Sequence, residues 1–261
     1  MKTEVLDHGY IRLVSYTQPV PDGLDKHGWA MRDRSWTGDL EIVRAARVSY
    51  NADWRKNDLN LGQSSDEKLI DFLWRNKHTS PFEAMTFSFE VQAPIFVFRQ
   101  WHRHRTQSYN EVSARYTELP ELFYVPDADQ VRAQSKSNKQ GRDEELDGRS
   151  VTLFRQQLTE ESSSQFNSYQ FWLAQGVARE LARLYLPVNT YSRMYASANL
   201  LNWFRFLTLR ADLHAQYEIR VYAEAMVAML ASVCPIAVTA FLRYRFDVTD
   251  VDAERERNTG L

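Results

Sequence analysis

The stretch from Gln100 to Tyr116 carries the densest set of chemically active side chains in the sequence. It holds three arginines, two histidines and one carboxylate between aromatic residues, and Arg99 lies just before it. A guanidinium is always charged and can grip two oxygens at once, so this composition suits planar or phosphorylated anions. A solvated helix face or a protein interface is the alternative explanation, because arginine clusters occur there too. We therefore treat the stretch as a candidate anion site.

Other common catalytic chemistries lack their sequence signals. His102 and His104 would point in different directions on a helix, and no further ligand set completes a metal site. Cys234 is the single cysteine and stands at the end of an apolar helix, where thiols are usually inert packing groups. The chain has neither a Gly-x-Ser-x-Gly elbow nor a glycine-rich phosphate loop. A nucleotide would therefore be held by side-chain cations rather than by a glycine-rich loop, and no metal site is expected.

Composition limits the partners. The chain has 261 residues, 44% of them hydrophobic, which is enough for a substantial core. Its 32 basic and 34 acidic residues give a net charge of −2, so general attraction to nucleic acid or to acidic membranes is not expected. Met1–Glu4 lack an apolar secretion core, and no run approaches the ~20 apolar residues that span a membrane. With only one cysteine, these features predict a cytoplasmic protein.

Periodicity predicts the elements that position the candidate site. We expect strands over residues 10–16 and 85–92, the second alternating apolar and polar throughout. Helices are expected over 40–48, with Asp39 capping the first turn, and over 65–74. A further helix over 95–104, with Pro94 at its first position, would carry Gln100, Arg99 and Arg103 past the end of the second strand.

The second half of the chain reads as mainly helical. Helices are predicted over 151–175 and 177–185, and an apolar stripe from Leu200 to Val233 predicts one sustained helix that ends at Pro235. On that helix Asn199, Arg210 and His214 would form a polar line beside the buried stripe. Solvent exposure is the alternative for that line, and a structural role is the alternative for His214.

Three segments fall outside these helices. If residues 111–115 are extended, Glu111, Ser113 and Arg115 share one face and form a polar wall. Residues 127–150 are polar without apolar periodicity, which predicts a mobile surface loop that covers the site or is an inert connector. The tail over 248–261 is expected to fray.

Several motifs together resemble one enzyme family, the flavin-dependent thymidylate synthases. The stretch Arg103-His104-Arg105, seven residues and then Ser113 reproduces that family's Arg-His-Arg-x7-Ser signature. Further matches occur in family order over nearly the whole chain: Arg44-Ala45-Ala46-Arg47-Val48-Ser49, His78-Thr79-Ser80-Pro81-Phe82-Glu83, Ala93-Pro94-Ile95-Phe96-Val97, Asn110-Glu111-x-Ser113-x-Arg115-Tyr116, Leu186-Pro187 and Leu209-Arg210-Ala211-Asp212-x-His214-Ala215-Gln216.

The resemblance implies a fold, an assembly and a reaction. The implied fold is α+β, a single domain over 1–261 with a central, mostly antiparallel sheet flanked by long helices. The implied assembly is a homotetramer whose sites are shared between subunits. The implied reaction is the reductive methylation of dUMP to dTMP with FAD, methylene-tetrahydrofolate and NADPH. Flavin supplies the hydride in this family and no protein nucleophile attacks the base, which agrees with the missing nucleophile above.

The resemblance also implies roles for individual residues. Arg210 matches the arginine that lies on the uracil carbonyl edge and favours the ionised, activated ring, a role that a fixed cation can fill. The residues that match dUMP contacts are Gln100, Arg103, Glu111, Ser113, Ala114, Arg115, Arg183 and Arg210. The residues that match FAD-side positions are Ser49, His78, Ser80, Glu83, Arg103, His104, Arg105, Asn110, Glu111, Asn199, Arg205 and His214.

Two positions depart from the family pattern, and one alternative function stays open. Leu201 stands where an arginine near the flavin adenosine is better known, and Arg205 stands where asparagine is often found. The shifted charge can still reach the same phosphates from one turn away. The alternative is an RNA-binding module that stacks bases on Trp101, Tyr109 and Tyr116.

Overall fold

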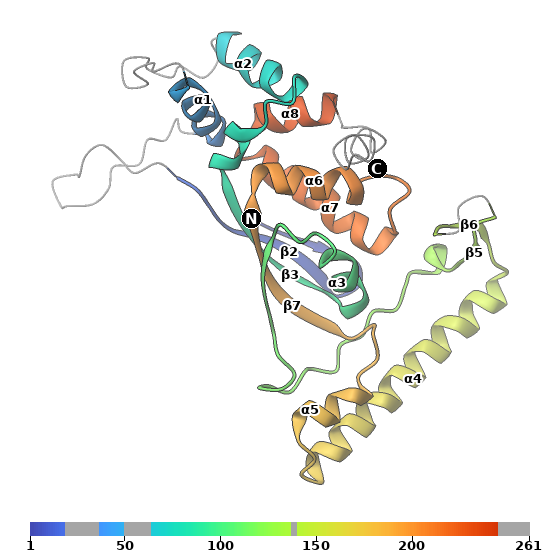
Figure 1. Ribbon diagram of the computed structural model, residues 1–261. Helices are drawn as coiled ribbons and strands as arrows, with labels where there is room; N and C mark the ends of the chain where they lie inside the picture. Colours follow the sequence, from blue (N-terminus) through green and yellow to red (C-terminus); the bar gives the residue numbers. More distant parts are fainter. Residues whose placement is uncertain (19–36, 50–63, 137–139, 245–261) are drawn as a thin grey trace, which may run out of the picture. The chain divides into compact units, whose positions relative to one another are not determined.

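A computed structural model describes residues 1–18, 37–49, 64–136 and 140–244 (Figure 1). The chain forms two compact units. The first comprises Met1–Arg12, Phe89–Ala196 and Arg210–Ala223; the second comprises the described parts of Leu13–Ser88, Ser197–Leu209 and Glu224–Leu261. The tail predicted to fray lies outside the described residues.

Five strands form the main sheet, in the order β1-β2-β3-β7-β4. The strands are β1 (Lys2–Val5), β2 (Gly9–Tyr16), β3 (Thr86–Pro94), β4 (Ser108–Glu111) and β7 (Tyr191–Asn199). β1 and β2 pair antiparallel, with Lys2 opposite Arg12 and Val5 opposite Gly9. Both predicted strands are confirmed, the one over residues 10–16 as part of β2 and the one over residues 85–92 as part of β3, from Thr86 on.

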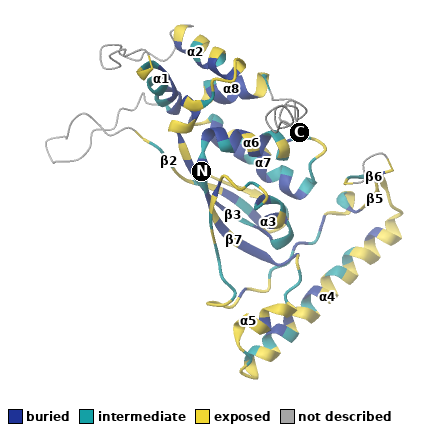
Figure 2. Cartoon of the chain, in the orientation of Figure 1, coloured by how far each residue is buried: buried dark blue, intermediate teal, exposed yellow. Residues whose placement is uncertain are grey.

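The middle of β3 is buried more completely than its alternation suggests. Phe89, Glu90 and Val91 are all buried in succession, and Figure 2 shows β3 and β7 mainly in dark blue. Glu90 is 3% exposed, and its carboxylate accepts hydrogen bonds from the hydroxyl of Tyr10 and from the guanidinium of Arg12. A buried carboxylate is tolerated when such donors compensate its charge, so Glu90 belongs to the sheet's structure.

Aromatic residues of the second unit pack around one tryptophan. The helices of this unit are α1 (Gly38–Val48), α2 (Ser64–Arg75), α8 (Pro235–Arg243), α6 (Leu200–Arg210) except its last residue, and α7 (Tyr217–Ala231) from Glu224 on. The Trp74 ring meets Phe82, Phe204 and Phe241 edge-on at centroid distances of 5.2, 5.1 and 5.9 Å. Helices α1 and α2 confirm the two predicted helices, whereas α8 was missed because Pro235 was read only as a helix end. Proline at the first position of α8 is well placed to begin a helix.

Asp39 caps a different helix from the one predicted. The carboxylate of Asp39 makes no cap contact in α1; it accepts the backbone N–H groups of Ile236 and Ala237, at 3.0 and 2.9 Å, at the start of α8. These are two of the orphan donors that every helix start presents. Asp39 is fully buried, and burial raises its pKa to about 6. The carboxylate therefore joins segments that are far apart in the sequence.

The first unit contains the helices α3 (Ile95–Trp101), α4 (Gly148–Ala174), α5 (Arg179–Ala182) and the start of α7 (Tyr217–Ala231). The long helix α4 is confirmed. Asp147 caps its start by accepting N–H groups of Arg149 and Ser150, and Gly176, at φ 83°, ends it in a left-handed turn. The helix predicted over 177–185 is shorter, with four residues of α5 followed by the 3-10 turn η3 (Arg183–Tyr185).

The sustained helix predicted from Leu200 to Val233 is wrong, because it is broken into α6 and α7. Asp212 explains the break: its carboxylate accepts the backbone N–H of His214 at 2.8 Å, a local contact that competes with helical hydrogen bonding. His214 consequently lies outside any helix, and Asn199 is the last residue of β7. The polar line of Asn199, Arg210 and His214 on one helix therefore does not form.

The polar segment 127–150 has more structure than a loop. It contains the 3-10 turn η2 (Ala128–Gln130) and an antiparallel hairpin of β5 (Arg132–Gln134) and β6 (Arg142–Glu145). Arg132 lies opposite Glu145, and the backbone N–H of Ser135 bonds the Gly141 carbonyl at 2.9 Å. Side-chain pairing across the strands stabilises this hairpin in place of an apolar face, which is why periodicity missed it.

The fold class is confirmed: the chain is α+β, with an antiparallel sheet and accompanying helices. A single domain over 1–261 stays a prediction.

Candidate functional site

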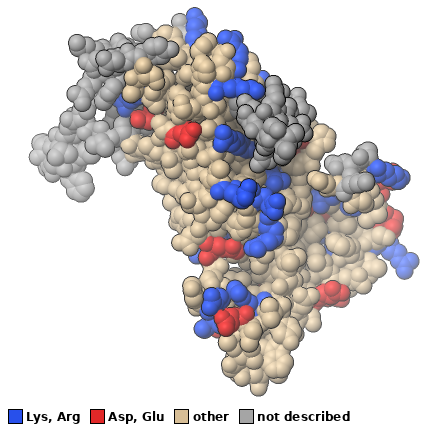
Figure 3. Space-filling view, in the orientation of Figure 1, with Lys and Arg blue, Asp and Glu red and all other residues tan. Residues whose placement is uncertain are grey.

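Helix α3 delivers the first group of candidate residues. Its inner face buries Val97, Phe98 and Trp101, while Gln100 is half-buried. The helix ends at Trp101, earlier than the predicted 104, and Pro94 is its cap residue and not its first residue. Arg103, His104 and Arg105 therefore follow in a turn. Arg103 and Arg105 are exposed, and among the described residues their side chains have no protein partner. Figure 3 shows several exposed Lys and Arg side chains in the view it draws.

Three hydrogen bonds hold that turn in place. The indole N–H of Trp101 donates to Gln107 at 3.0 Å, and the Tyr109 hydroxyl donates to the carbonyls of Trp101 and His104 at 3.2 and 2.7 Å. Burial raises the pKa of Tyr109 to about 12, so its hydroxyl remains a donor at neutral pH. Trp101 is fully buried and Tyr109 half-buried, so neither offers the open ring face that the RNA-binding alternative requires. Only Tyr116, at 81% exposure, does so.

Arg210 is held by His104. The Nε–H of Arg210, the last residue of α6, donates to Nε2 of His104 at 3.0 Å. Burial, with a further contribution from the Arg210 charge, lowers the pKa of His104 to about 4. The imidazole is therefore neutral at pH 7 and can accept this hydrogen bond. Because Nε is engaged, the two terminal nitrogens of the guanidinium are the part that can reach a planar ligand.

A cavity of about 370 Å³ gathers the second group of candidate residues. Glu111, at the end of β4, accepts a hydrogen bond from the Ser192 hydroxyl at 2.8 Å. Ser113 is half-buried, and its hydroxyl accepts the backbone N–H of Arg115 at 3.2 Å. The cavity is lined by Ile95, Arg99, Glu111, Val112, Ser113, Ala114, Leu119, Arg183, Leu186 and Ser192.

The extended wall predicted over 111–115 is wrong beyond its first residues. Strand β4 ends at Glu111, and the chain enters a turn at Ala114. Arg115 leaves the face it was predicted to share with Glu111 and Ser113, and pairs with Glu180 at 3.2 Å. Both partners of that ion pair are more than half exposed, so the pair is weak and Arg115 can exchange it for a ligand anion. Arg183, in η3, lines the cavity and donates from Nε to the Glu180 carbonyl at 3.3 Å.

Half of the residues matched to the flavin side lie in the second unit. Ser49, His78, Ser80 and Glu83 are all exposed. Asn199 is half-buried; its amide donates to Glu83 at 3.5 Å, and its oxygen accepts the backbone N–H of Asn202 at 2.9 Å.

The two departures from the family pattern have different surroundings. Leu201 is 3% exposed and belongs to the core. Arg205 is exposed on α6 and donates to the side-chain oxygen of Asn202 at 3.2 Å. Arg205, one turn further along α6, therefore supplies the exposed positive charge that Leu201 does not. In the first unit, Asn110 is exposed on β4, and Nδ1 of the exposed His214 lies 2.8 Å from the Asp212 carboxylate.

Sequence reasoning missed one residue, Glu218, that is connected to the candidate residues of α3. Glu218 is 2% exposed and bonds the amide of Gln216, which in turn bonds Gln100. Gln216 is part of the motif quoted above. Glu218 lies two residues further, and its burial depends on Tyr124 and Arg142, which no local pattern connects to it.

Three further observations concern other chemistries. Cys234 is fully buried, and burial raises its pKa well above the usual range, so it cannot serve as a thiolate nucleophile. Among the described residues, no group of three or more His, Cys, Asp or Glu side chains is placed to hold a metal ion. In the same part of the chain, no helix combines the length and apolarity needed to cross a membrane.

Comparison with known proteins adds independent information. The family model for thymidylate synthase complementing protein matches residues 33–236. A flavin-dependent thymidylate synthase from Gluconobacter oxydans (strain 621H) is 43% identical over 253 residues, which cover 96% of this chain and 75% of that protein. One from Dictyostelium discoideum is 40% identical over 246 residues, covering 94% and 75%. The crystal structure of the UMP/dUMP methylase PolB from Streptomyces cacaoi, bound with 5-Br dUMP, superposes with a TM-score of 0.76 at 34% identity, covering 92% of this chain and 97% of that one.

Proposed function

The chain belongs to the flavin-dependent thymidylate synthases, and we propose that it converts dUMP to dTMP by reductive methylation. Methylene-tetrahydrofolate is the carbon donor, NADPH the reductant, and tetrahydrofolate the folate product. The similarity to a UMP/dUMP methylase of solved structure, bound with 5-Br dUMP, supports a uracil nucleotide such as dUMP as the substrate. The relatives do not support the RNA-binding alternative, and the buried Trp101 argues against it.

The observation that carries the proposal is the pair of His104 and Arg210. A neutral imidazole fixes Nε of the guanidinium, so the positive charge is already oriented when a ligand arrives. A cation on the carbonyl edge of uracil stabilises negative charge that develops on the ring, and pre-orientation makes this stabilisation effective. Arg210 is the proposed catalytic residue, and the buried Cys234 leaves activation of the ring to such electrostatics.

The remaining first-unit residues are proposed to bind the nucleotide. Arg99 and Arg183 line the cavity that contains Glu111, Ser113 and Ala114, a set suited to a phosphate and a sugar hydroxyl. Gln100, Arg103 and Arg115 complete the proposed dUMP set, and Arg103 is available because its guanidinium has no partner among the described residues.

The donor set also fits FAD. Arg103 and Arg105 offer exposed cations for a pyrophosphate, and Arg205 offers another on α6. For a ribose and a heterocycle, the exposed Asn110 and His214 offer an amide and an imidazole in the first unit, and the exposed Ser49, His78 and Ser80 offer hydroxyl and imidazole groups in the second. The proposed FAD residues are Ser49, His78, Ser80, Glu83, Arg103, His104, Arg105, Asn110, Glu111, Asn199, Arg205 and His214. FAD bound there would supply the hydride after reduction by NADPH.

A homotetramer with shared sites is supported by an apolar surface on the first unit. Trp172, Leu181, Leu184 and Tyr185 line an apolar groove of about 440 Å³. Leu184 is 77% exposed and Leu181 56%, and exposed apolar groups gathered in this way mark interaction surfaces. Tyr185 and Leu184 flank the cavity-lining Arg183 in η3, so a subunit bound there would lie close to the nucleotide residues. We propose a cytoplasmic location and no membrane or nucleic-acid partner, in keeping with the single, buried free cysteine.

The decisive experiment combines a spectrum with a tritium-release assay. Purified protein should show a flavin absorption band that changes on addition of dUMP. It should release tritium from ring-labelled dUMP only when both methylene-tetrahydrofolate and NADPH are present. A colourless protein that binds neither FAD nor dUMP would overturn the proposal, and steep salt-dependent binding to generic RNA would revive the alternative.

A further inference from the structure

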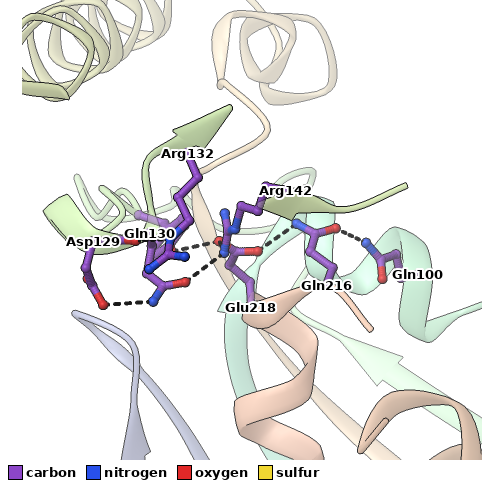
Figure 4. Close-up of polar contacts among 8 residues, drawn as sticks. Gln100, Asp129, Gln130, Arg132, Arg142, Gln216 and Glu218 are labelled. Carbon is purple, nitrogen blue, oxygen red and sulfur yellow. Dashed lines mark hydrogen bonds and ion pairs between the residues drawn. The ribbon is translucent and has the colours of Figure 1, made fainter. Parts of the chain in front are cut away.

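A chain of hydrogen bonds leads from a buried carboxylate to Gln100 (Figure 4). Oε2 of Glu218, on α7, accepts from the Gln216 amide nitrogen at 2.8 Å. The Gln216 oxygen in turn accepts from the amide nitrogen of Gln100. All three residues lie in the first unit, and Gln100 is the residue proposed to contact dUMP.

The Glu218 carboxylate, where this series of hydrogen bonds begins, is held by two further donors. Oε1 of Glu218 accepts from the Tyr124 hydroxyl and from the Arg142 guanidinium, both at 3.0 Å. Burial raises the pKa of the Tyr124 phenol, which keeps it a donor. Arg142 belongs to β6 and also donates to the side-chain oxygen of Gln130 at 3.1 Å. With Glu218 only 2% exposed, the carboxylate has fixed neighbours on both of its oxygens.

The chemistry of the carboxylate sets the direction of every amide in the chain. An ionised carboxylate only accepts hydrogen bonds, so Gln216 must turn its NH2 group toward Glu218. The oxygen of Gln216 then faces Gln100, and the NH2 group of Gln100 donates to it. The Gln100 oxygen is left as a free acceptor, beside the second N–H of the same amide. This direction follows from Glu218 itself, although the two ends of an amide are nearly alike in shape.

We propose that Glu218 is a positioning residue which, through Gln216, orients Gln100 so that its side-chain oxygen accepts a hydrogen bond from dUMP. The inference rests on the proposed function, because it requires Gln100 to contact the nucleotide. It adds that the group recognised on dUMP is a donor. The donors of dUMP near its base and sugar are the ring N3–H and the 3′-hydroxyl, and a uracil carbonyl, which only accepts, cannot be the partner of the Gln100 oxygen.

Glu218→Gln tests the direction of this series of hydrogen bonds, because glutamine has nearly the same shape as glutamate. Tyr124 and Arg142 both donate, so the new amide must turn its oxygen toward them and its NH2 group toward Gln216. Gln216 and Gln100 then reverse, and Gln100 presents NH2 to the donor of dUMP. We expect the KM for dUMP to rise about five- to tenfold, the worth of a single hydrogen bond, with kcat at saturating dUMP within about twofold of wild type. FAD content should be unchanged.

The sheet provides a matched control. Glu90 is also buried and is also paired with a tyrosine and an arginine, Tyr10 and Arg12, but within the described residues no series of amide hydrogen bonds leads from it to Gln100. Glu90→Gln removes the same charge and is expected to leave the KM for dUMP unchanged even if it lowers the melting temperature. Equal KM increases in the two variants would show a general structural effect and would overturn the proposal.

Gln216→Met provides a second test that keeps Glu218 paired with Tyr124 and Arg142. The assay is competition against dUMP by two substrate analogues, N3-methyl-dUMP and 2′,3′-dideoxyuridine monophosphate, each lacking one donor. Wild type should bind one of them about five- to tenfold more weakly than dUMP, and that preference should shrink to about twofold or less in Gln216→Met. The analogue whose affinity relative to dUMP recovers in the variant lacks the group of dUMP that donates to Gln100.

The outcomes separate the inference from the proposed function. Wild-type protein that fails to bind dUMP sinks the proposed function before any variant is made. If wild-type protein turns over dUMP, the proposed function stands. If the Gln216→Met variant then discriminates against both analogues as strongly as wild type does, the positioning role of Glu218 is overturned.

Discussion

The Arg210 guanidinium donates from Nε to Nε2 of His104 at 3.0 Å, which joins the end of α6 to the turn after α3. The pair is unusual for an arginine contact, because the acceptor is a neutral ring in place of a carboxylate. A carboxylate would neutralise the charge that Arg210 is proposed to direct at uracil. A neutral imidazole fixes the geometry and leaves the positive charge intact, provided that His104 stays unprotonated.

Removing the charge of Arg210 should abolish most of the chemistry. We expect Arg210→Ala to lower kcat about 10²- to 10³-fold, since one oriented electrostatic contact is typically worth that much. FAD should remain bound, as judged by the visible spectrum. Arg210→Lys should recover little activity, because a lysine cannot both bond His104 and present a planar fork. An Arg210→Ala enzyme with near-normal kcat would remove this residue from the catalytic role.

Removing the acceptor should loosen Arg210 without removing its charge. His104→Ala is expected to lower kcat about tenfold or more, because the guanidinium loses its fixed Nε contact. His102→Ala is the control, since the neighbouring ring of His102 instead lies against Tyr109, at a centroid distance of 4.7 Å. Steady-state kinetics at saturating dUMP compares the two. The same kcat loss in both variants would assign the effect to the turn as a whole.

The pH dependence of stability gives a separate test of His104. Its pKa falls from 6.5 to about 4 on folding, mainly through burial. The unfolded chain therefore takes up a proton between these values while the folded chain does not, so this group's contribution is fully present above pH 6.5 and is lost as pH falls toward about 4. Urea unfolding of wild type and His104→Gln over this range should show a shallower loss in the variant. Parallel curves would contradict the neutral, buried imidazole.

The proposed interface predicts a change of oligomeric state. Leu184→Glu places a charge on the apolar groove with Trp172 and Leu181, and burying that charge between subunits would cost far more than the contact contributes. Size-exclusion chromatography with light scattering should show smaller species at micromolar concentration and, if sites are shared, lower activity. Leu146→Glu, at a 40% exposed leucine before α4, is the control and should not change the assembly.

Local pattern and family motif predicted different parts of this protein. Alternation located β3, and apolar spacing with an acidic first turn located α2, because those signals depend only on neighbouring residues. The same reasoning failed at Asp212, where one sustained helix was predicted. The Asp212 side chain accepts the backbone N–H of His214, and the chain breaks into α6 and α7. The reasoning also failed for Arg115, which follows a turn to Glu180.

The polar residues that organise the site were the hardest to predict. Glu218 depends on Tyr124 and Arg142, and His104 depends on Arg210, so each pairing exists only after distant segments have folded together. The motif named His104 and Arg210 separately, and the structure supplies the contact between them. Burial then lowers the pKa of His104 and raises the pKa of Tyr124, which no sequence pattern encodes.

Asp39 provides the last prediction, with a pH dependence opposite to that of His104. Asp39→Ala leaves the N–H groups of Ile236 and Ala237 without an acceptor in the core, and we expect the free energy of unfolding to fall by about 2 kcal/mol. Because burial raises the pKa of Asp39 from 3.8 to about 6, its contribution to stability is largest below pH 3.8 and is lost as pH rises through about 6.

Asp39→Asn isolates that titration, since it keeps one acceptor and removes the charge. Urea unfolding should show wild type more stable than Asp39→Asn near pH 4, with the difference narrowing as pH rises toward 6 and beyond. Glu67→Gln, a change at an exposed carboxylate in the first turn of α2, serves as the control and should keep a constant offset from wild type. A difference between wild type and Asp39→Asn that widens with pH would show that the folded protein favours the charged form, and that the two N–H groups outweigh burial.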